Sequence, residues 1–403
     1  MLGAIPILAL SCGAATSQTP SSPVLNNQVQ LGDVFAEQTL DVVTADESTA
    51  AITTSIGNAM TAGSAGRNMD VQSYQELQGA VQAHTVVDVA ANMGVTGSVT
   101  TTATGNTGDT LISGATVTAV QTQVTGPTSV YALGQIEAAN ATVGDMNHAT
   151  QAIANSQGFS LVNSAMGARV SQWNESNVLA DGGAIVGEST GQATVTANAA
   201  ANNLASVGVN ESAQRIIATQ GNSGDSVQAS KFTAYGQSYT STTNATAAAN
   251  NINLSNQGSL MDATTNQTNT AYVRAQAEGT AAVFSSQTVT AFGAGNSTLA
   301  GNMGAELVLD NTQFNGGGGV EVIAVADGTY GWDNSASASA VGNAVTGYAC
   351  SSCTSRMTVN NSQTNDTDVS ARTTTRMGNG RSVTGVASAV GNTASFYTAS
   401  PSE

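Results

Sequence analysis

The stretch Ser362–Asn392, SQTNDTDVSARTTTRMGNGRSVTGVASAVGN, carries the features that recur along the whole chain. It opens at Gln363, passes through two segments in which apolar and polar residues alternate, and closes at Gly391-Asn392. The closing asparagine recurs every 46–49 residues, at Asn58, Asn106, Asn155 (directly after Ala154), Asn202, Asn250, Asn296, Asn343 and Asn392. The opening glutamine recurs every 46–50 residues, at Gln28, Gln75, Gln123, Gln172, Gln220, Gln267, Gln313 and Gln363.

Two apolar columns keep the same phase as these amides. The residue four positions before each glutamine is apolar in all eight copies: Val24, Val71, Ala119, Ala168, Ile216, Ala263, Leu309 and Val359. Six positions before the glutamine, methionine or leucine recurs at Met69, Met166, Met261, Leu307 and Met357. A fixed period of 20 to 50 residues is typical of solenoids and arrays. The columns therefore predict inward-facing strands of a repeat protein.

Composition favours one elongated all-β domain over residues 23–400. Of the 403 residues, 40% are hydrophobic, 4% are aromatic and 9% are charged, so the core must be thin and built from small side chains. Disorder would require many charged residues or abundant proline, and this sequence has only 9% charged residues and five prolines. Four of the five prolines lie near the ends, as long sheets require.

The amino terminus resembles a secretory signal. Residues 1–15 contain an apolar run followed by small residues, residues 16–22 are expected to form a linker, and residues 401–403 a short tail. Cys12 raises the alternative of lipidation, although its preceding residues match a lipobox poorly. No other stretch has the ~20 apolar residues of a membrane helix.

Each 48-residue repeat divides into four short alternating segments, with the glutamine and asparagine expected at turns, where stacked amides form ladders. About 18 residues separate each asparagine from the next glutamine and about 30 separate that glutamine from its asparagine. This spacing favours two coils per repeat of a parallel β-solenoid, and one larger coil per repeat is the alternative.

The residues of catalytic and metal sites are scarce. His84 and His148 are the only histidines and occupy unrelated repeat positions, which argues against a catalytic triad or a histidine metal site. Cys350 and Cys353 form a C-x-x-C pair without a second pair, and in an exported protein a local disulfide is expected. We therefore expect no catalytic residue, no metal and no cofactor.

The net charge of −17 also limits the partners. Nucleic acids and anionic membranes select basic patches, so neither is expected as a partner. No calcium loop pattern occurs, and Gly316–Gly319 lacks the lysine of a phosphate loop. A β-helix polysaccharide lyase is the enzymatic alternative, but nine basic residues are spread too thinly to hold uronates.

The acidic Ala/Thr/Gly/Asn-rich repeats, with closing motifs such as VASAVGNTASFYTA at 386–399, resemble the HfaD family of holdfast-attachment proteins of stalked bacteria. A more distant resemblance is to curlin fibre subunits, with Gln363, Asn365, Gly391 and Asn392 in comparable turn positions, although the strict curlin spacing is absent. The resemblance implies an exported anchor at the outer membrane or cell surface, at the cell pole or stalk tip. Its implied partners are a curlin-like anchor subunit, an outer-membrane secretion component and an adhesive polysaccharide. A generic secreted adhesin passenger remains the alternative.

The two ends of the repeat array differ in charge. The first repeat carries five carboxylates and no basic residue, at Asp33, Glu37, Asp41, Asp46 and Glu47. The last carries four of the nine basic residues of the chain, Arg356, Arg372, Arg376 and Arg381. One interpretation is that these charges protect open edges from aggregation. The other is that the basic end docks the acidic end of a second copy or of a curlin-like partner.

Overall fold

The computed structural model describes residues 21–350 and 356–399, and all regular elements of this part of the chain are β-strands. Eight short strands form one parallel sheet: β1 (Ser22–Gln30), β4 (Met69–Leu77), β6 (Thr116–Thr125), β8 (Ala165–Asn174), β10 (Ala213–Asn222), β12 (Leu260–Asn269), β14 (Glu306–Gly316) and β16 (Arg356–Asp366). Six long strands alternate with them: β5 (Val81–Ser113), β7 (Ser129–Val162), β9 (Asn177–Val209), β11 (Ser226–Asn256), β13 (Tyr272–Asn302) and β15 (Val320–Cys350). The first and last coils each have two shorter strands instead: β2 (Val34–Thr44), β3 (Ser48–Ala65), β17 (Val369–Asn379) and β18 (Ser382–Ala399).

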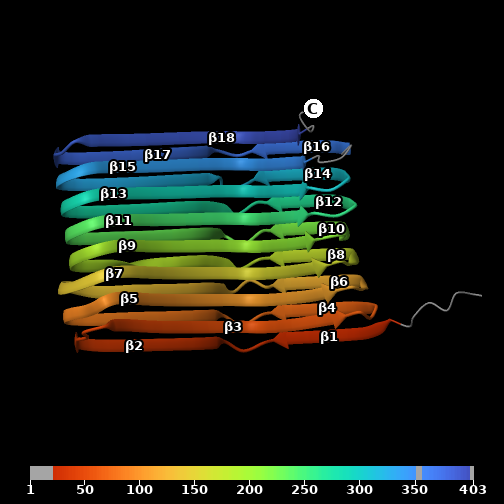
Figure 1. Cartoon of the computed structure of the whole chain (residues 1–403), viewed down its shortest axis with the longest axis horizontal. Coiled ribbons are helices and arrows are strands. Elements are labelled where there is room, and N and C mark those ends of the chain that lie inside the picture. Colours follow the sequence, from red (N-terminus) through yellow and green to blue (C-terminus); the bar gives the residue numbers. More distant parts are fainter. Residues whose placement is uncertain (1–20, 351–355, 400–403) are drawn as a thin grey trace, which may run out of the picture.

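Every neighbouring pair of strands is parallel and belongs to successive repeats. In the short-strand sheet Gln75 pairs in register with Gln28 and Gln123, and in the long strands Asn106 pairs with Asn58 and Asn155. Figure 1 shows the resulting stack, which runs from β1 and β2 at one edge to β18 at the other. The predicted all-β solenoid of eight repeats is confirmed.

The prediction of two coils per repeat is wrong, because the ladder partner of each residue lies a full repeat away. Two coils per repeat would have required pairing at separations of about 18 and 30 residues, whereas Asn250 pairs with Asn202 and Asn296. Each repeat is therefore one large coil. At ~4.8 Å per coil the stack is roughly 38 Å tall, while an 18-residue strand such as β3 runs roughly 60 Å, so the coil is wider than the stack is tall.

Each long strand bends into two arms. In β5 the first arm, residues 81–89, pairs with β2, and the second arm, residues 96–113, pairs with β3, with a register shift between them. The first arm and the short strand form one layer, and the second arm folds back over both. Thr101 on the second arm donates a hydrogen bond to Thr85 on the first arm across the layers (2.7 Å).

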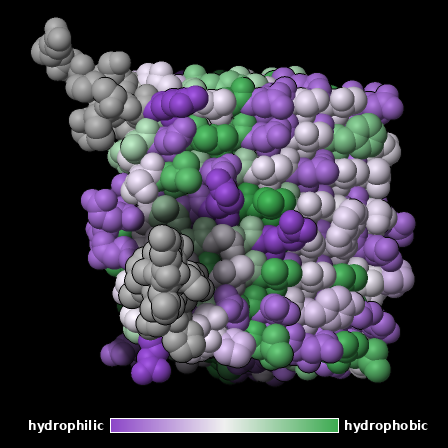
Figure 2. Space-filling model, turned by 90° about the vertical axis from the view of Figure 1, so that its right-hand side faces the viewer, coloured by the Kyte–Doolittle hydropathy of each residue, from purple (hydrophilic) through white to green (hydrophobic). Residues whose placement is uncertain are grey.

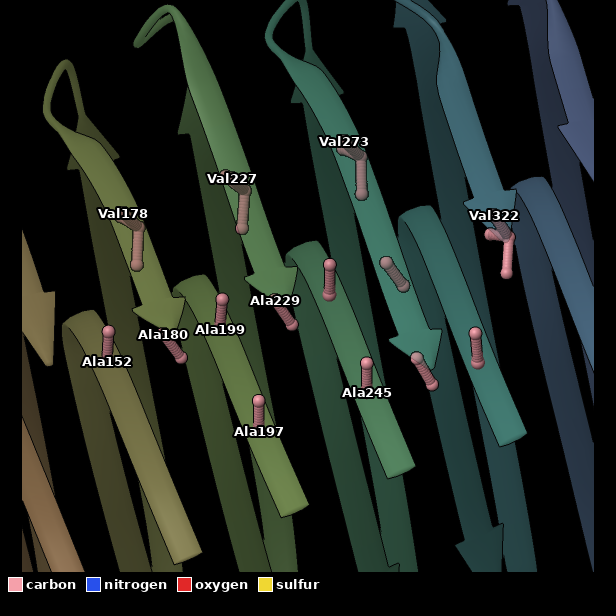
Figure 3. Packing of buried hydrophobic residues seen from close by; sticks show 14 of the residues in the cluster. Ala152, Val178, Ala180, Ala197, Ala199, Val227, Ala229, Ala245, Val273 and Val322 are labelled. Atoms are coloured by element: carbon pink, nitrogen blue, oxygen red, sulfur yellow. The ribbon is translucent and has the colours of Figure 1, made fainter. Parts of the chain in front are cut away.

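The core lies between these two layers and consists mainly of alanine and valine. Alternation along each arm buries about every second residue, as in Val178 and Ala180 on a first arm and Ala197 and Ala199 on the second arm that faces it. Figure 3 shows these side chains pointing toward one another from the two layers. Small side chains on both layers allow the sheets to pack closely, which explains the composition.

The apolar column that runs four residues before each glutamine is confirmed as one inward-facing row. Val71, Ala119, Ala168, Ile216, Ala263 and Leu309 are paired in sequence and are each at most 6% exposed. Val24 and Val359 extend the row at its two ends and are half-buried, because each end coil has a neighbour on one side only.

The expectation that glutamine and asparagine mark turns is wrong. Gln267 lies inside β12 and Asn250 inside β11, and both side chains are fully buried. The chain leaves the strands at residues 257–259 and 270–271 instead. Curlin-like turn positions are likewise not found at Gln363 and Asn365, which lie in β16, or at Gly391 and Asn392, which lie in β18.

Several predicted features fall outside the described residues. These are the signal-like segment 1–15, Cys12, most of the linker 16–22, Cys353 of the cysteine pair, and the tail 401–403. Within the described residues, no helix is long and apolar enough to cross a membrane.

Candidate functional site: amide ladders, a buried lysine and the end coils

The eight glutamines form a continuous glutamine ladder inside the solenoid. Each Nε2 donates to the Oε1 of the glutamine one coil toward the amino terminus, over seven bonds of 2.7–2.9 Å. The second hydrogen of each amide bonds a backbone carbonyl on the facing second arm, as Gln75 does with Thr107 (2.9 Å). The same crossing contact repeats in the other seven coils.

The eight asparagines form a second row, the long-strand asparagine ladder, with the opposite direction. Each Nδ2 donates to the Oδ1 of the asparagine one coil toward the carboxyl terminus, over seven bonds of 2.8–2.9 Å. Asparagines 58 to 343 also donate across the core to the facing short strand, as Asn106 does with the Val124 carbonyl (2.9 Å). The two ladders therefore fasten the layers to each other from both sides.

A third row, the short-strand asparagine ladder, was not predicted. Asn174, Asn222, Asn269, Asn315 and Asn365 are joined by bonds of 2.7–2.8 Å. Its sequence signal is the pattern Gln-x-Asn, which is present in the last five repeats, since each of these asparagines stands two residues after a ladder glutamine and so shares its face of the strand.

The chemistry of the ladders is structural. A buried amide that lacks partners costs roughly 1–3 kcal/mol, so each amide enforces the register of the next. A shift of one coil by a single residue would bring every amide to the opposite face of its strand. The ladders thus select one stacking of the eight coils.

The strongest departure from the apolar core is Lys231, which is 1% exposed. Its Nζ donates to Thr150 Oγ1 (2.6 Å) and the Gly134 carbonyl (3.4 Å) and lies 3.3 Å from His148 Nε2. Gly182 occupies the coil between, at φ +120°, and a Cβ there would lie 1.9 Å from the Gly134 carbonyl oxygen. These glycines leave the channel into which the lysine side chain extends.

Burial controls the ionisation of this cluster. It lowers the pKa of Lys231 to about 7, and the Asp181 carboxylate opposes that shift. Burial also lowers the pKa of His148 well below its ordinary value, with a further contribution from Lys231. His84, the other histidine, packs edge-on against Phe35 and Tyr131 on the outer face of the first arms and is only partly buried. The two histidines are therefore apart, and no group of His, Cys, Asp or Glu within the described ranges could hold a metal ion.

Three of the four arginines at the carboxyl end pair with the coil below. Arg356 faces Glu306, Arg376 faces Asp327 and Arg381 faces Asp333, all on exposed surface. Arg372, by contrast, is exposed and has no carboxylate within salt-bridge distance among residues 21–350 and 356–399. The structure therefore brings the four predicted arginines to one end, but divides their roles.

Both end coils present open edges. In the described part of the chain, the outer edges of β1, β2 and β3 and of β16, β17 and β18 have no strand partner. Apolar side chains are exposed on both end coils, including Phe35 and Ile52 on the first and Val386 and Phe396 on the last. By contrast, Figure 2, which turns the right-hand side of Figure 1 toward the viewer, shows hydrophilic and hydrophobic residues interspersed along the side of the stack.

Comparison with known proteins gives one consistent result. Residues 43–319, more than half of the chain, match the family described as Holdfast attachment protein D (HfaD). A curated relative, Holdfast attachment protein D of Caulobacter vibrioides (strain ATCC 19089 / CIP 103742 / CB 15), is 47% identical over 69 residues, which are 17% of this chain and 23% of that protein. No solved structure matches.

Proposed function

Because the chain belongs to the HfaD family of holdfast attachment proteins, we propose that it is a non-catalytic structural protein of the cell surface that helps to anchor an adhesive polysaccharide, the holdfast, to the outer membrane. The observation that carries this proposal is the unbroken run of ladders through all eight coils. Such a scaffold is suited to transmitting load between partners, because every coil is hydrogen-bonded to the next along its full length.

The location and partners of this anchor are part of the proposal. We propose export to the outer membrane or cell surface, at the cell pole or stalk tip. The partners would be a curlin-like anchor subunit, an outer-membrane secretion component and the polysaccharide itself. The signal-like residues 1–15 support this assignment, and so does a composition in which only 9% of residues are charged and most of these are acidic.

We further propose that the end coils dock onto another β-structure, either a curlin-like partner or a second copy of this chain. The open edges support this, and so does the direction of the ladders. At the first coil, Gln28 uses one amide hydrogen on the Ala59 carbonyl, which leaves the other available along the stack. At the last coil, Gln363 Oε1 accepts only a weak bond from Asn361 (3.4 Å) within the described ranges. The long-strand asparagine ladder runs in the opposite direction, so it leaves an acceptor at the first coil and a donor at the last. Each ladder is therefore complementary head to tail, which is the geometry of an open filament.

The decisive experiment is deletion of the gene followed by measurement of where the adhesive is found. We expect cells to release their adhesive into the medium, and expression of the full chain to restore retention. Adhesive that stays normally anchored would contradict the anchor function. Calcium-dependent cleavage of uronate polymers by the purified chain would instead favour a polysaccharide lyase.

A further inference from the structure

A hollow of about 450 Å³ opens at the bend of β15, and its walls come from three successive coils. Tyr330 and Trp332 stand at its rim on either side of Gly331 and are 59% and 62% exposed. Tyrosine and tryptophan are enriched at binding surfaces, because each joins a large apolar ring to a polar group. Tyr330 pairs with Val283 and Asn379 in the neighbouring coils, and Trp332 stands at the bend, where its carbonyl accepts a hydrogen bond from the backbone N–H of Arg381 (2.9 Å).

The floor of the hollow is built so that it stays open. Phe284 of the preceding coil lies beneath it and is 4% exposed. A Cβ on Gly331 would come within 2.4 Å of the Phe284 ring, and a Cβ on Gly380 within 2.2 Å of the Met377 sulfur. Glycine at these two positions therefore lets the backbone lie flat against an apolar base.

The polar groups of the rim are already balanced in charge. Arg381 Nε donates to Asp333 Oδ1 (3.1 Å), and the guanidinium carbon lies 5.9 Å from the centre of the Trp332 ring. Asn379 pairs with Tyr330 across the neighbouring strands, and its side-chain amide also lines the hollow. Because Asp333 compensates Arg381, the hollow offers hydrogen-bond donors and acceptors without a strong net field.

We propose that this hollow is a saccharide-binding site that takes a neutral hexopyranose unit of a glycan chain. The C–H face of a pyranose ring is apolar and stacks on indole and phenol rings, while its hydroxyl groups bond planar amide, guanidinium and carboxylate groups. An anionic sugar would find no uncompensated positive charge, because Asp333 offsets Arg381, and a small apolar ligand would need a more enclosed pocket.

This inference rests on the proposed function, because it gives the polysaccharide anchor a contact point on the chain. The arrangement also gives a direct optical test, since Trp332 and Trp173 are the two tryptophans and Trp173 lies on β8, several coils away. In a Trp173→Phe background the fluorescence of the full chain reports on Trp332 alone.

The probes are cello-, malto- and manno-oligosaccharides, with oligogalacturonate as the anionic comparison. We expect a saturable fluorescence change with at least one neutral series and a weaker response to oligogalacturonate. Trp332→Ala and Tyr330→Ala, tested by calorimetry with the responding sugar, should each weaken binding about tenfold or more. Tyr239→Ala removes an aromatic ring of similar exposure (60%) that does not line the hollow, and should leave binding unchanged.

Absence of a response to every neutral series, or equal losses in the Tyr239 and Trp332 variants, would overturn the site. The two proposals fail separately. If deletion of the gene releases the adhesive but the purified chain binds no sugar, the site is wrong and the anchor stands. If the sugar binds at Trp332 but deletion leaves the adhesive anchored, the anchor function is wrong and the site stands.

Discussion

Replacing Asn250 with alanine tests whether the ladders hold the coils together. Asn250 is fully buried, accepts a bond from Asn202 (2.8 Å) and donates to Asn296 (2.8 Å) and to the Thr268 carbonyl (2.9 Å). Each lost bond costs about 1 kcal/mol net, and the stranded donor of Asn202 and acceptor of Asn296 add roughly 1–3 kcal/mol each if no group replaces their partner. Allowing for partial relaxation, we expect a loss of about 3–6 kcal/mol.

The assay is equilibrium denaturation of the full chain together with hydrogen exchange resolved by segment. The matched control is Asn253→Ala, which removes an exposed amide from the same strand and should change stability by less than about 0.5 kcal/mol. Exchange should accelerate in β9, β11 and β13 and remain slow in distant coils, because repeat stability is close to a sum over neighbours. Equal stabilities of the two variants, or uniform loss of protection, would refute the structural role of the ladder.

Four further outcomes are expected. Ile216→Asp puts an unpaired carboxylate into the apolar row and should cost several kcal/mol in denaturation, whereas Ile217→Asp, on the exposed neighbour, should cost little. Because the pKa of Lys231 is lowered to about 7, the unfolded chain binds one more proton than the folded chain between about pH 7 and 10.4. The free energy of unfolding should therefore rise with pH in this range by up to about 1.4 kcal/mol per pH unit. Lys231→Met should flatten that slope when unfolding is measured as a function of pH. The lowered pKa of His148 has the same sign below about pH 6.5, so acid should destabilise the chain further, and a stability that increased on acidification would contradict this. If charge steers the end coils, Arg372→Glu should weaken association at low salt in sedimentation and have little effect at high salt, while leaving the three intrachain arginine pairs intact.

The repeat length and the inward faces could be predicted from sequence because burial follows alternation, which survives in every copy. The coil size could not, because no chain-breaking residue recurs at the bend of every long strand. At Ser238–Thr240, for example, the register shifts in a run of Ser, Tyr and Thr that also reads as continuous strand. The same pattern therefore fits two small coils or one large one.

The amide rows were predicted by their period but assigned to turns, because isolated Asn and Gln favour surfaces. Stacking changes that preference, since each buried amide finds an identical partner one coil away. Lys231 was not predicted as a buried residue, although the sequence contains a signal for it. It lies two residues after Ala229 and four after Val227, so it belongs to the same inward-facing side of the strand. Recognising its environment required knowing that Gly134 and Gly182 occupy the same column in the two preceding coils.

The pairing of each coil with the next has a mechanical consequence. When force pulls on a terminal coil, its backbone bonds can be broken in sequence along the edge, and complete detachment releases about 48 residues of extended chain, roughly 160 Å, from a layer only ~4.8 Å thick. The detached length relaxes the applied tension, while the next coil presents the same ladders and resists in the same way. The stack would then lengthen in repeated steps that dissipate work, and its rupture would be gradual where a single rigid joint would fail at once.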